Sequence, residues 1–399
     1  MDIVYERAAG MDISKRDAKV CVRVPSDRPG QFRKQVSTYG ATTGEVLRLR
    51  RDLEDAGVGV VVMEATGDYW KPFFFVLAET LNVQLVNAKQ ARNIPGRKTD
   101  VSDATWLAEL AAHGLLRASF VPPEPIRQLR DLTRTRTHLV QEENREWARL
   151  EKNLEDSGIK LSSVVSTLKI VSARRMLDAL VAGERDPHVL AGMAHTSMLK
   201  KSGALVEALT GRFTDHHAFM VSLHLDRIDA ITASVSAVEE RIDEVMQPFQ
   251  VARELLSTIP GISTLVADVI IAEIGVDMSV FPTPGHLASW AGVCPGQNES
   301  AGRVKSTHTR PGDGYLKGTL GIAALAISRM DNNRLAARYH RVRARTTRLK
   351  AIVAIEHTVL VIVWNMLRSG LAYDDLGPDY YQRRNPDRTK NRALRQLEA

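Results

Sequence analysis

Four carboxylates in the first quarter of the sequence have the side-chain type and placement of a metal site: Asp12, Glu64, Asp100 and Asp103. Asp12 lies in a short apolar run, and Glu64 directly follows the run VGVVVM. Carboxylate oxygens suit Mg²⁺ or Mn²⁺, and two such ions about 3.5 to 4 Å apart can bind the attacking and leaving oxygens of a phosphodiester. Four like charges would repel one another without a cation, so we predict a divalent-metal site that serves phosphate chemistry.

Each acid also has an ordinary structural interpretation. Asp100 would serve as a helix N-cap, and Asp103 as a first-turn acid that interacts favourably with the helix dipole. Only the joint placement of the four acids favours a metal site over these roles.

Hydrophobic patterning predicts the elements that position the acids. Strand patterns occur at residues 8–13, 18–24, from 31 onward, 58–63 and 83–86. Helical patterns occur at residues 43–56, 70–81 and 101–113. This order predicts a mixed sheet in which Asp12 and Glu64 lie side by side, because the continuous apolar run before Glu64 is typical of a buried central strand. Asp100 and Asp103 are predicted to share one helix face, with Cβ atoms about 5 to 6 Å apart.

Length and composition indicate a soluble protein of two or three domains. The chain has 399 residues, and its two cysteines, Cys21 and Cys294, provide no disulfide framework. The amino terminus has no signal-peptide pattern. The apolar run 351–367 contains Glu356 and His357, which favours a buried helix over a membrane span. We therefore expect no membrane association and a cytoplasmic location.

The net charge of +7 is concentrated near the carboxyl terminus. Residues 334–350 contain seven basic residues and no acid, a net charge of +7. Residues 381–399 contain six basic and two acidic residues, a net charge of +4, so the rest of the chain has a net charge of −4. Such a footprint favours a nucleic-acid partner, although a solvated helix face or a disordered basic tail would look similar. The predicted contacts in the first stretch are Arg338, Arg341, Arg343 and Arg345.

Two long helical stretches lie between the acidic and basic regions. One runs from Ile126 to Gly158 after the stiff segment VPPEP, and the other has near-heptad spacing from Leu225 to Pro248. They are either an antiparallel pair within one chain or a dimerisation arm, and the sequence leaves both open. Basic residues also make the first helix a possible nucleic-acid contact: Arg127, Arg130, Arg134 and Arg136.

Two further segments have local signals. Residues 257–275 contain a Pro-Gly turn that opens an apolar helix, similar to helix-hairpin-helix elements that present backbone N–H groups to phosphate. Residues 290–320 form a Gly-rich polar segment between two apolar helices, predicted to be a long loop. In it Ser300 is flanked by small residues, with Arg303, Lys305 and Arg310 near; by itself this serine is more typical of a turn than of a nucleophile.

Five motifs together resemble the transposases of insertion-sequence family 110, in order and across nearly the whole chain: GMDISKRDAKVCV, MEATGDYWKP, IPGRKTDVSDATWLAELAAHGLL, TIPGIS…AEIG and LASWAGVCPGQNESAGRVKS. The resemblance implies a RuvC-like, RNase H-like DEDD domain with Asp12, Glu64, Asp100 and Asp103 as Mg²⁺ or Mn²⁺ ligands. It also implies that Ser300 is a nucleophile that forms a phosphoserine link to DNA. Arg97 and Lys98, in the IPGRKTD motif, are further predicted nucleic-acid contacts.

The resemblance implies an α/β plus α architecture with four parts. These are a RuvC-like domain at 1–125, a helical coiled-coil region at 126–250, a mainly helical transposase domain at 251–380 and a basic tail at 381–399. The implied partners are donor and target DNA and a structured noncoding guide RNA, the bridge RNA. The chains would form a tetramer in which one active site combines acids and serine from different protomers.

The segment after the serine departs from the family pattern. Where the family often has a KGN-type turn followed by Trp-Leu-Arg, this chain reads RPGDGYLKGT, so Pro311, Asp313 and Lys317 differ from the expected residues.

Three other functions remain open on sequence grounds. A RuvC-like junction nuclease would use the same acids to activate water. An actin-like ATPase shares the GMDIS opening, although the Gly-rich second phosphate loop is missing. A non-catalytic nucleic-acid-binding assembly factor would use the charge without the acids.

Overall fold

The computed structural model describes residues 3–28, 30–65, 67–87, 102–296, 298–384 and 386. The chain forms two compact units, Met1–Val121 and Pro122–Ala399. The boundary falls in the proline-containing segment that separates the acidic region from the first long helix.

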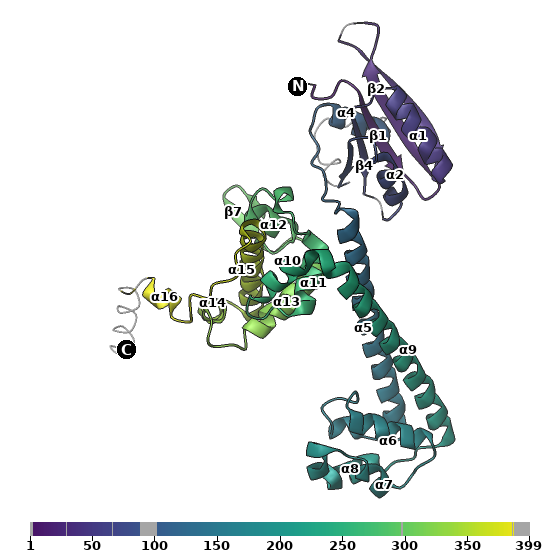
Figure 1. Cartoon of the computed structure of the whole chain (residues 1–399), viewed down its shortest axis with the longest axis vertical. Helices are drawn as coiled ribbons and strands as arrows, with labels where there is room; N and C mark the ends of the chain where they lie inside the picture. Colours follow the sequence, from purple (N-terminus) through teal and green to yellow (C-terminus); the bar gives the residue numbers. More distant parts are fainter. Residues whose placement is uncertain are drawn as a thin grey trace. The chain divides into compact units, whose positions relative to one another are not determined.

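The first unit contains a five-stranded mixed sheet (Figure 1). Its strands are β1 (Ala8–Ile13), β2 (Asp17–Pro25), β3 (Phe32–Gly40), β4 (Val60–Glu64) and β5 (Val83–Val86), in the order β3-β2-β1-β4-β5. The helices among its described residues are α1 (Thr43–Asp55), α2 (Trp70–Leu77) and α4 (Asp103–Ala112). The first three strands are antiparallel, whereas β4 pairs parallel with both β1 and β5. This confirms the predicted element order and the RNase H-like mixed sheet, although α2 and α4 are shorter than predicted.

The sheet is covered on both faces. Met11 and Met63 pack with α1 and α2 on one face, whereas Ala8, Val60 and Val62 pack with α4 on the other. Every residue of β4 is buried, which explains why its sequence is continuously apolar.

Helix α4 approaches the sheet most closely at Gly10. A Cβ atom at this position would lie 2.3 Å from both the Ala104 carbonyl oxygen and the Ala108 nitrogen. Because these are backbone atoms of a helix that packs on the sheet, they cannot move aside as a flexible side chain would. The glycine in the sequence GMDIS therefore sets the distance between β1 and α4.

We expect Gly10→Ala to lower the free energy of unfolding by about 1 to 3 kcal/mol, since overpacking forces backbone shifts. Urea unfolding of the full chain measures this change. The matched control is Gly44→Ala in α1, where an added Cβ has no neighbour within 4 Å. Equal stability of the two variants would contradict the proposed close approach.

In the second unit, α5 (Glu124–Asp156) and α9 (Asp215–Met246) lie side by side (Figure 1). They are antiparallel, because Arg136 of α5 pairs with Glu239 while Glu146 pairs with His224. Between them in the chain, α6 (Val171–Val181), α7 (Pro187–Gly192) and α8 (Ser202–Leu209) share one hydrophobic core with the adjoining ends of both long helices. The pairing within one chain, which the sequence left open, is therefore present.

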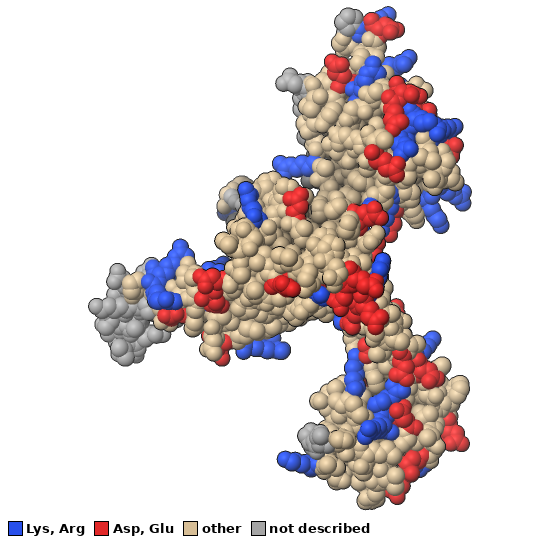
Figure 2. All heavy atoms as spheres, in the orientation of Figure 1, with Lys and Arg blue, Asp and Glu red and all other residues tan. Residues whose placement is uncertain are grey.

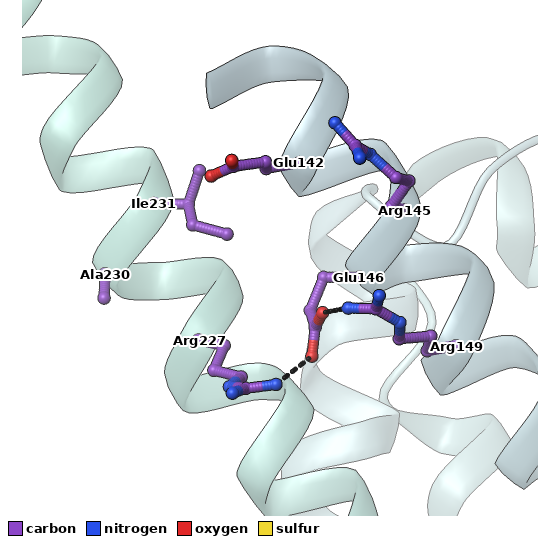
Figure 3. A pocket seen from close by; sticks show the side chains of 7 residues that line it. All are labelled: Glu142, Arg145, Glu146, Arg149, Arg227, Ala230 and Ile231. Atoms are coloured by element: carbon purple, nitrogen blue, oxygen red, sulfur yellow. Dashed lines mark hydrogen bonds and ion pairs between the residues drawn. The ribbon is translucent and has the colours of Figure 1, made fainter. Parts of the chain in front are cut away.

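A buried carboxylate joins the two long helices. Glu146 is 3% exposed; its Oε1 atom lies 2.7 Å from His224 Nδ1, and its Oε2 accepts a 2.6 Å hydrogen bond from Arg149 Nη1. Arg227 also contacts this carboxylate (Figure 3). Burial alone would raise the pKa of Glu146, but the hydrogen bonds from His224 and Arg149 outweigh it and lower the pKa below its ordinary value.

A carboxyl group with a lowered pKa stabilises the fold above its unfolded-state pKa, and the contribution disappears as the pH falls through the folded-state pKa. We therefore expect Glu146→Gln to cost about 2 kcal/mol at pH 7, and less below about pH 4. Urea unfolding of both proteins at the two pH values provides the measurement. A difference in stability that stays constant with pH would contradict this role.

The remaining described helices follow in the carboxyl-terminal part of the second unit, where several of them contact α15. They are α10 (Gln250–Ser257), α11 (Thr264–Ile274), α12 (Pro284–Trp290), α13 (Gly314–Ile327), α14 (Arg334–Arg343), α15 (Arg348–Ser369) and α16 (Tyr380–Arg383). Among the described helices, α15 has the length and apolar composition of a membrane span, but half of its apolar window is buried. Its Trp364 Nε1 donates a 2.9 Å hydrogen bond to the Phe281 carbonyl oxygen. This is the arrangement of a core helix, as the sequence predicted.

Candidate active site

Asp12 and Glu64 lie on neighbouring strands at the same edge of the sheet. The parallel register pairs Met11 with Met63, and each acid is the next residue of its strand. Because side chains alternate along a strand and both methionines pack against α1 and α2, the two acids point to the face that α4 covers. Asp12 is exposed, whereas Glu64 is 7% exposed.

The amino-terminal end of α4 reaches this edge. The helix runs antiparallel to β1: Tyr5 N, before the strand, donates to the Ala112 carbonyl oxygen at the far end of α4. Ala104 lies over Gly10, two residues before Asp12. Asp103, in the first turn of α4, is therefore beside the edge that carries Asp12 and Glu64.

The alternative role suggested for Asp100, an N-cap at the start of this helix, is wrong. Ser102 is the N-cap of α4, with ψ 147°, and its side chain accepts from Thr105 N. The prediction that Asp100 and Asp103 share one helix face involves a residue that the structure does not describe. The N-cap role suggested for Asp100 belongs to Ser102. Asp100, Arg97 and Lys98 themselves lie outside the described residues.

The acids suit a hard divalent cation in ligand chemistry, since all would offer carboxylate oxygens. Across the described ranges, however, no three His, Cys, Asp or Glu side chains gather closely enough to hold a metal ion. Asp12, Glu64 and Asp103 thus define the edge at which a site would form, and the fourth predicted ligand is outside the described residues.

The structure adds a basic residue that the sequence analysis did not single out. Lys19 on β2 lies directly opposite Asp12 in the antiparallel register and is exposed. Cross-strand partners project from the same face, so a cation lies next to the acidic edge. Only the register of β1 against β2 reveals that Lys19 lies opposite Asp12. Predicting that register from the sequence requires the length of the β1–β2 turn.

Ser300 belongs to a short β-hairpin and not to the long loop that the sequence predicted. Its strands are β6 (Asn298–Ser300) and β7 (Arg303–Ser306). The two turn residues, Ala301 and Gly302, have φ values of 51° and 73°, the pattern of a type I′ turn. Ala301 is the one described non-glycine residue with positive φ, so the turn beside Ser300 has a strained backbone.

The hairpin presents basic residues beside the serine position. Arg303 is the cross-strand partner of Ser300, and Lys305 is two residues further along β7; both are exposed. Arg310 donates a 2.5 Å hydrogen bond to Ser289 Oγ, so this predicted nucleic-acid contact also connects the hairpin to α12.

The base of the hairpin is closed by contacts between backbones. A Cβ atom on Gly312 would lie 1.9 Å from the Ala291 carbonyl oxygen, and one on Gly292 would lie 2.7 Å from the Arg310 carbonyl oxygen. Gly296 N also donates to the His308 carbonyl oxygen. Glycines at these positions allow the two ends of the segment to meet.

The basic stretch at 334–350 forms α14, a turn and the first residues of α15. Arg341, Arg343 and Arg345 are exposed, whereas Arg338 is half-buried. Figure 2 shows Lys and Arg side chains gathered near α16, with acidic side chains beside them, and Arg341 stacks over the Tyr381 ring at 5.0 Å. The tail beyond residue 386 lies outside the described residues.

Arginines of the first long helix that were predicted to contact nucleic acid pair instead with acids of the same chain. Arg130 and Arg134 contact Glu273, and Arg136 contacts Glu239. Their interactions hold α5 against α11 and α9. The sequence contains one indication of this pairing: Glu273 lies inside the apolar run LVADVIIAEIG. A carboxylate buried in such a run needs a partner of opposite charge.

Comparisons with known proteins agree with this architecture. The DEDD transposase family model of the IS110 type matches residues 9–158, and the model described as Transposase IS116/IS110/IS902 family matches residues 253–340. An insertion element IS900 uncharacterized 42 kDa protein of Mycobacterium paratuberculosis is 25% identical over 405 residues, covering 92% of this chain and 96% of the relative. An insertion element IS110 uncharacterized 43.6 kDa protein of Streptomyces coelicolor is 29% identical over 155 residues, covering 38% of this chain and 37% of that protein.

Proposed function

Because the chain belongs to the IS110/IS116/IS902 family of transposases, which are DNA phosphotransfer enzymes, we propose that it recombines DNA through a covalent bond to Ser300. The observation that carries this proposal is the hairpin: it places the Ser300 position beside a strained turn and opposite the exposed Arg303. A nucleophile at a tip can approach a DNA backbone without the surrounding helices colliding with the duplex.

The acids of the first unit supply the second half of the chemistry. Asp12, Glu64 and Asp103, with Asp100, would hold Mg²⁺ or Mn²⁺. A bound divalent cation would neutralise charge on the phosphodiester oxygens and so favour attack. Lys19, opposite Asp12, provides a further cation for the DNA backbone.

The proposed step exchanges one phosphodiester for another. The Ser300 oxygen forms a bond to phosphorus while the bond from phosphorus to one deoxyribose oxygen breaks. The serine proton passes to a carboxylate or to solvent, and the departing oxygen takes up a proton. A hydroxyl of the second DNA molecule later reverses the exchange and releases serine, so no ATP is required.

We further propose that the acids and the serine of one active site come from different protomers of a tetramer. Half-buried apolar residues along α9 support an additional helix-to-helix contact: Ile231, Val235 and Val238. The same proposal includes the division of the chain into four parts at residues 125, 250 and 380. It also includes a helix-hairpin-helix role for the turn between α10 and α11.

A structured guide RNA, whose loops pair with donor and target DNA, would specify the sites. Sequence recognition then lies in base pairing, while protein cations bind backbones. The exposed arginines of α14 and the following turn suit this role because each can neutralise one phosphate.

We expect Arg343→Gln combined with Arg345→Gln to lower the slope of log affinity against log salt by about 0.9 for each lost duplex phosphate contact. Filter binding between about 50 and 200 mM salt measures the slope. The control is Arg212→Gln, an exposed arginine near α8. An unchanged slope in the double variant would show that these arginines do not bind phosphate.

The decisive experiment incubates the full chain, the element-derived RNA and DNA carrying both sites with Mg²⁺, followed by denaturation. We expect protein covalently attached to DNA. Free DNA ends without attached protein would instead indicate a junction nuclease that activates water, and ATP turnover without nucleic acid would indicate an actin-like ATPase.

A further inference from the structure

The segment that connects the Ser300 hairpin to α13 ends at a residue with two structural partners. Asp313, one of the positions that depart from the family pattern, is the N-cap of α13: its Oδ1 atom accepts a 2.8 Å hydrogen bond from Leu316 N. Its Oδ2 atom accepts a 3.0 Å hydrogen bond from Arg134 Nη2 of α5. Both carboxylate oxygens therefore have partners within the protein, which gives Asp313 a structural role.

Arg134 is itself fixed on its other side. Its Nε and Nη2 atoms each donate a 2.8 Å hydrogen bond to the carboxylate of Glu273, which is fully buried in α11. Arg130 contacts the same carboxylate at 3.1 Å and donates to the Ala272 and Glu273 carbonyl oxygens. A planar guanidinium held at two nitrogens has little rotational freedom, so Arg134 presents a fixed donor to Asp313.

The charges of this cluster depend on one another. Burial raises the pKa of Glu273 against the hydrogen bonds from Arg134, and burial lowers the pKa of Arg130 against the attraction of Glu273. Since neither charge is well solvated, each stabilises the ionised form of the other. The cluster joins α5, α11 and the start of α13 through charged hydrogen bonds.

A second contact between α13 and α5 lies one helical turn further along α5. Arg134 stacks over the Tyr315 ring at 4.5 Å, and the Tyr315 hydroxyl lies 2.7 Å from His138 Nε2. Tyr315 is also within the altered segment RPGDGYLKGT. Two residues of that segment thus have partners on α5.

Gly312 connects this junction to the hairpin. It directly precedes Asp313, and its backbone touches Ala291 and Gly292, where the other end of the hairpin segment begins. A shift of Asp313 would therefore move both ends of the hairpin base together. Reactions between positioned groups are sensitive to such shifts, since a displacement of about 1 Å can cost about 100-fold in rate.

We propose that Arg134 and Asp313 are positioning residues for the Ser300 hairpin, with Arg134 fixed by Glu273 and holding Asp313 and hence the hairpin base against α5. The inference rests on the proposed role of Ser300 and adds residues outside the reacting groups. It also gives the altered segment a function, because Asp313 and Tyr315 form the contacts to α5.

The primary test variant is Asp313→Asn in the full chain. Asparagine caps helices as well as aspartate does, so the start of α13 is retained while the charge that pairs with Arg134 is lost. Arg134→Lys is the second variant, because lysine keeps the charge but lacks the planar fork. The control is Arg136→Gln, which removes the neighbouring arginine of α5 that pairs with Glu239 outside this cluster.

Three measurements are made on each variant: amide hydrogen exchange in residues 291–313, DNA affinity, and the single-turnover rate of adduct formation. We expect Asp313→Asn and Arg134→Lys to speed exchange in this segment about 10-fold and to slow adduct formation about 10- to 100-fold. DNA affinity should stay within about twofold, and the control should match the unmodified chain in all three measurements.

Unchanged hydrogen exchange in both variants would overturn the proposal, as would faster exchange with an unchanged rate of adduct formation. Loss of rate that is fully explained by weaker DNA binding would overturn it as well. If the unmodified chain forms no adduct, the proposed function fails, whereas hydrogen exchange still decides whether Arg134 and Asp313 hold the hairpin.

Discussion

The Ser300→Ala variant is expected to form no covalent protein–DNA adduct and to lose recombination by at least about 10⁴-fold, because the alanine side chain has no oxygen to attack phosphorus. The measurement is denaturing electrophoresis of labelled DNA after incubation with Mg²⁺ and the element-derived RNA. DNA binding should remain, since the neighbouring cations are unchanged. If the variant binds DNA but forms no adduct, the defect lies in the chemical step and not in folding.

Ser306→Ala is the matched control for this prediction. Ser306 is in the same hairpin, at the end of β7, and its Oγ accepts a 3.1 Å hydrogen bond from His308 N. Its replacement removes a hydroxyl of the same kind from the same element. A normal yield of adduct from Ser300→Ala, or an equal loss in both variants, would show that the nucleophile lies elsewhere.

Glu64→Gln is expected to slow adduct formation by about 100- to 1000-fold, and Asp12→Asn by a similar factor. Each substitution keeps the shape of the side chain and removes one negative charge from the sheet edge shared by β1 and β4. Fewer negative charges weaken cation binding, so both variants should need more Mg²⁺ for half-maximal rate. A titration of single-turnover rate against Mg²⁺ concentration provides the measurement.

Asp68→Asn is the control for charge alone. Asp68 follows β4 in the chain and pairs with Lys71 on the surface. Its loss should leave both the maximal rate and the Mg²⁺ requirement unchanged, because an exposed ion pair contributes little. If Glu64→Gln recombines DNA normally, the acids of the first unit have no part in the reaction.

Local sequence patterns predicted much of the first unit correctly. The alternation in residues 18–24 and the continuous apolar run before Glu64 are imposed by burial of one or two strand faces, so they are visible without knowing the partners. The same holds for the long helices, where the apolar stripes that join α5 and α9 repeat every three or four residues. Element order then indicated the pairing of β1 with β4.

Boundaries and roles that depend on distant residues were not predicted. The residue that caps the start of α4 is Ser102, and its cap replaces the role suggested for Asp100. The predicted long loop around Ser300 contains a hairpin, because a two-residue turn at Ala301 and Gly302 allows strands of three and four residues to pair. Such short strands lack the length that reveals a period.

The sequence by itself determined the family resemblance, the four acids, the serine and the location of the positive charge, because these are properties of residue identity and spacing. Only the tertiary structure decided what the charged residues of α5 do. Arg134 looks like a nucleic-acid contact in sequence, but its partners Glu273 and Asp313 are 139 and 179 residues away. Pairing across such separations is set by how helices pack, and packing brings together side chains that no local pattern relates.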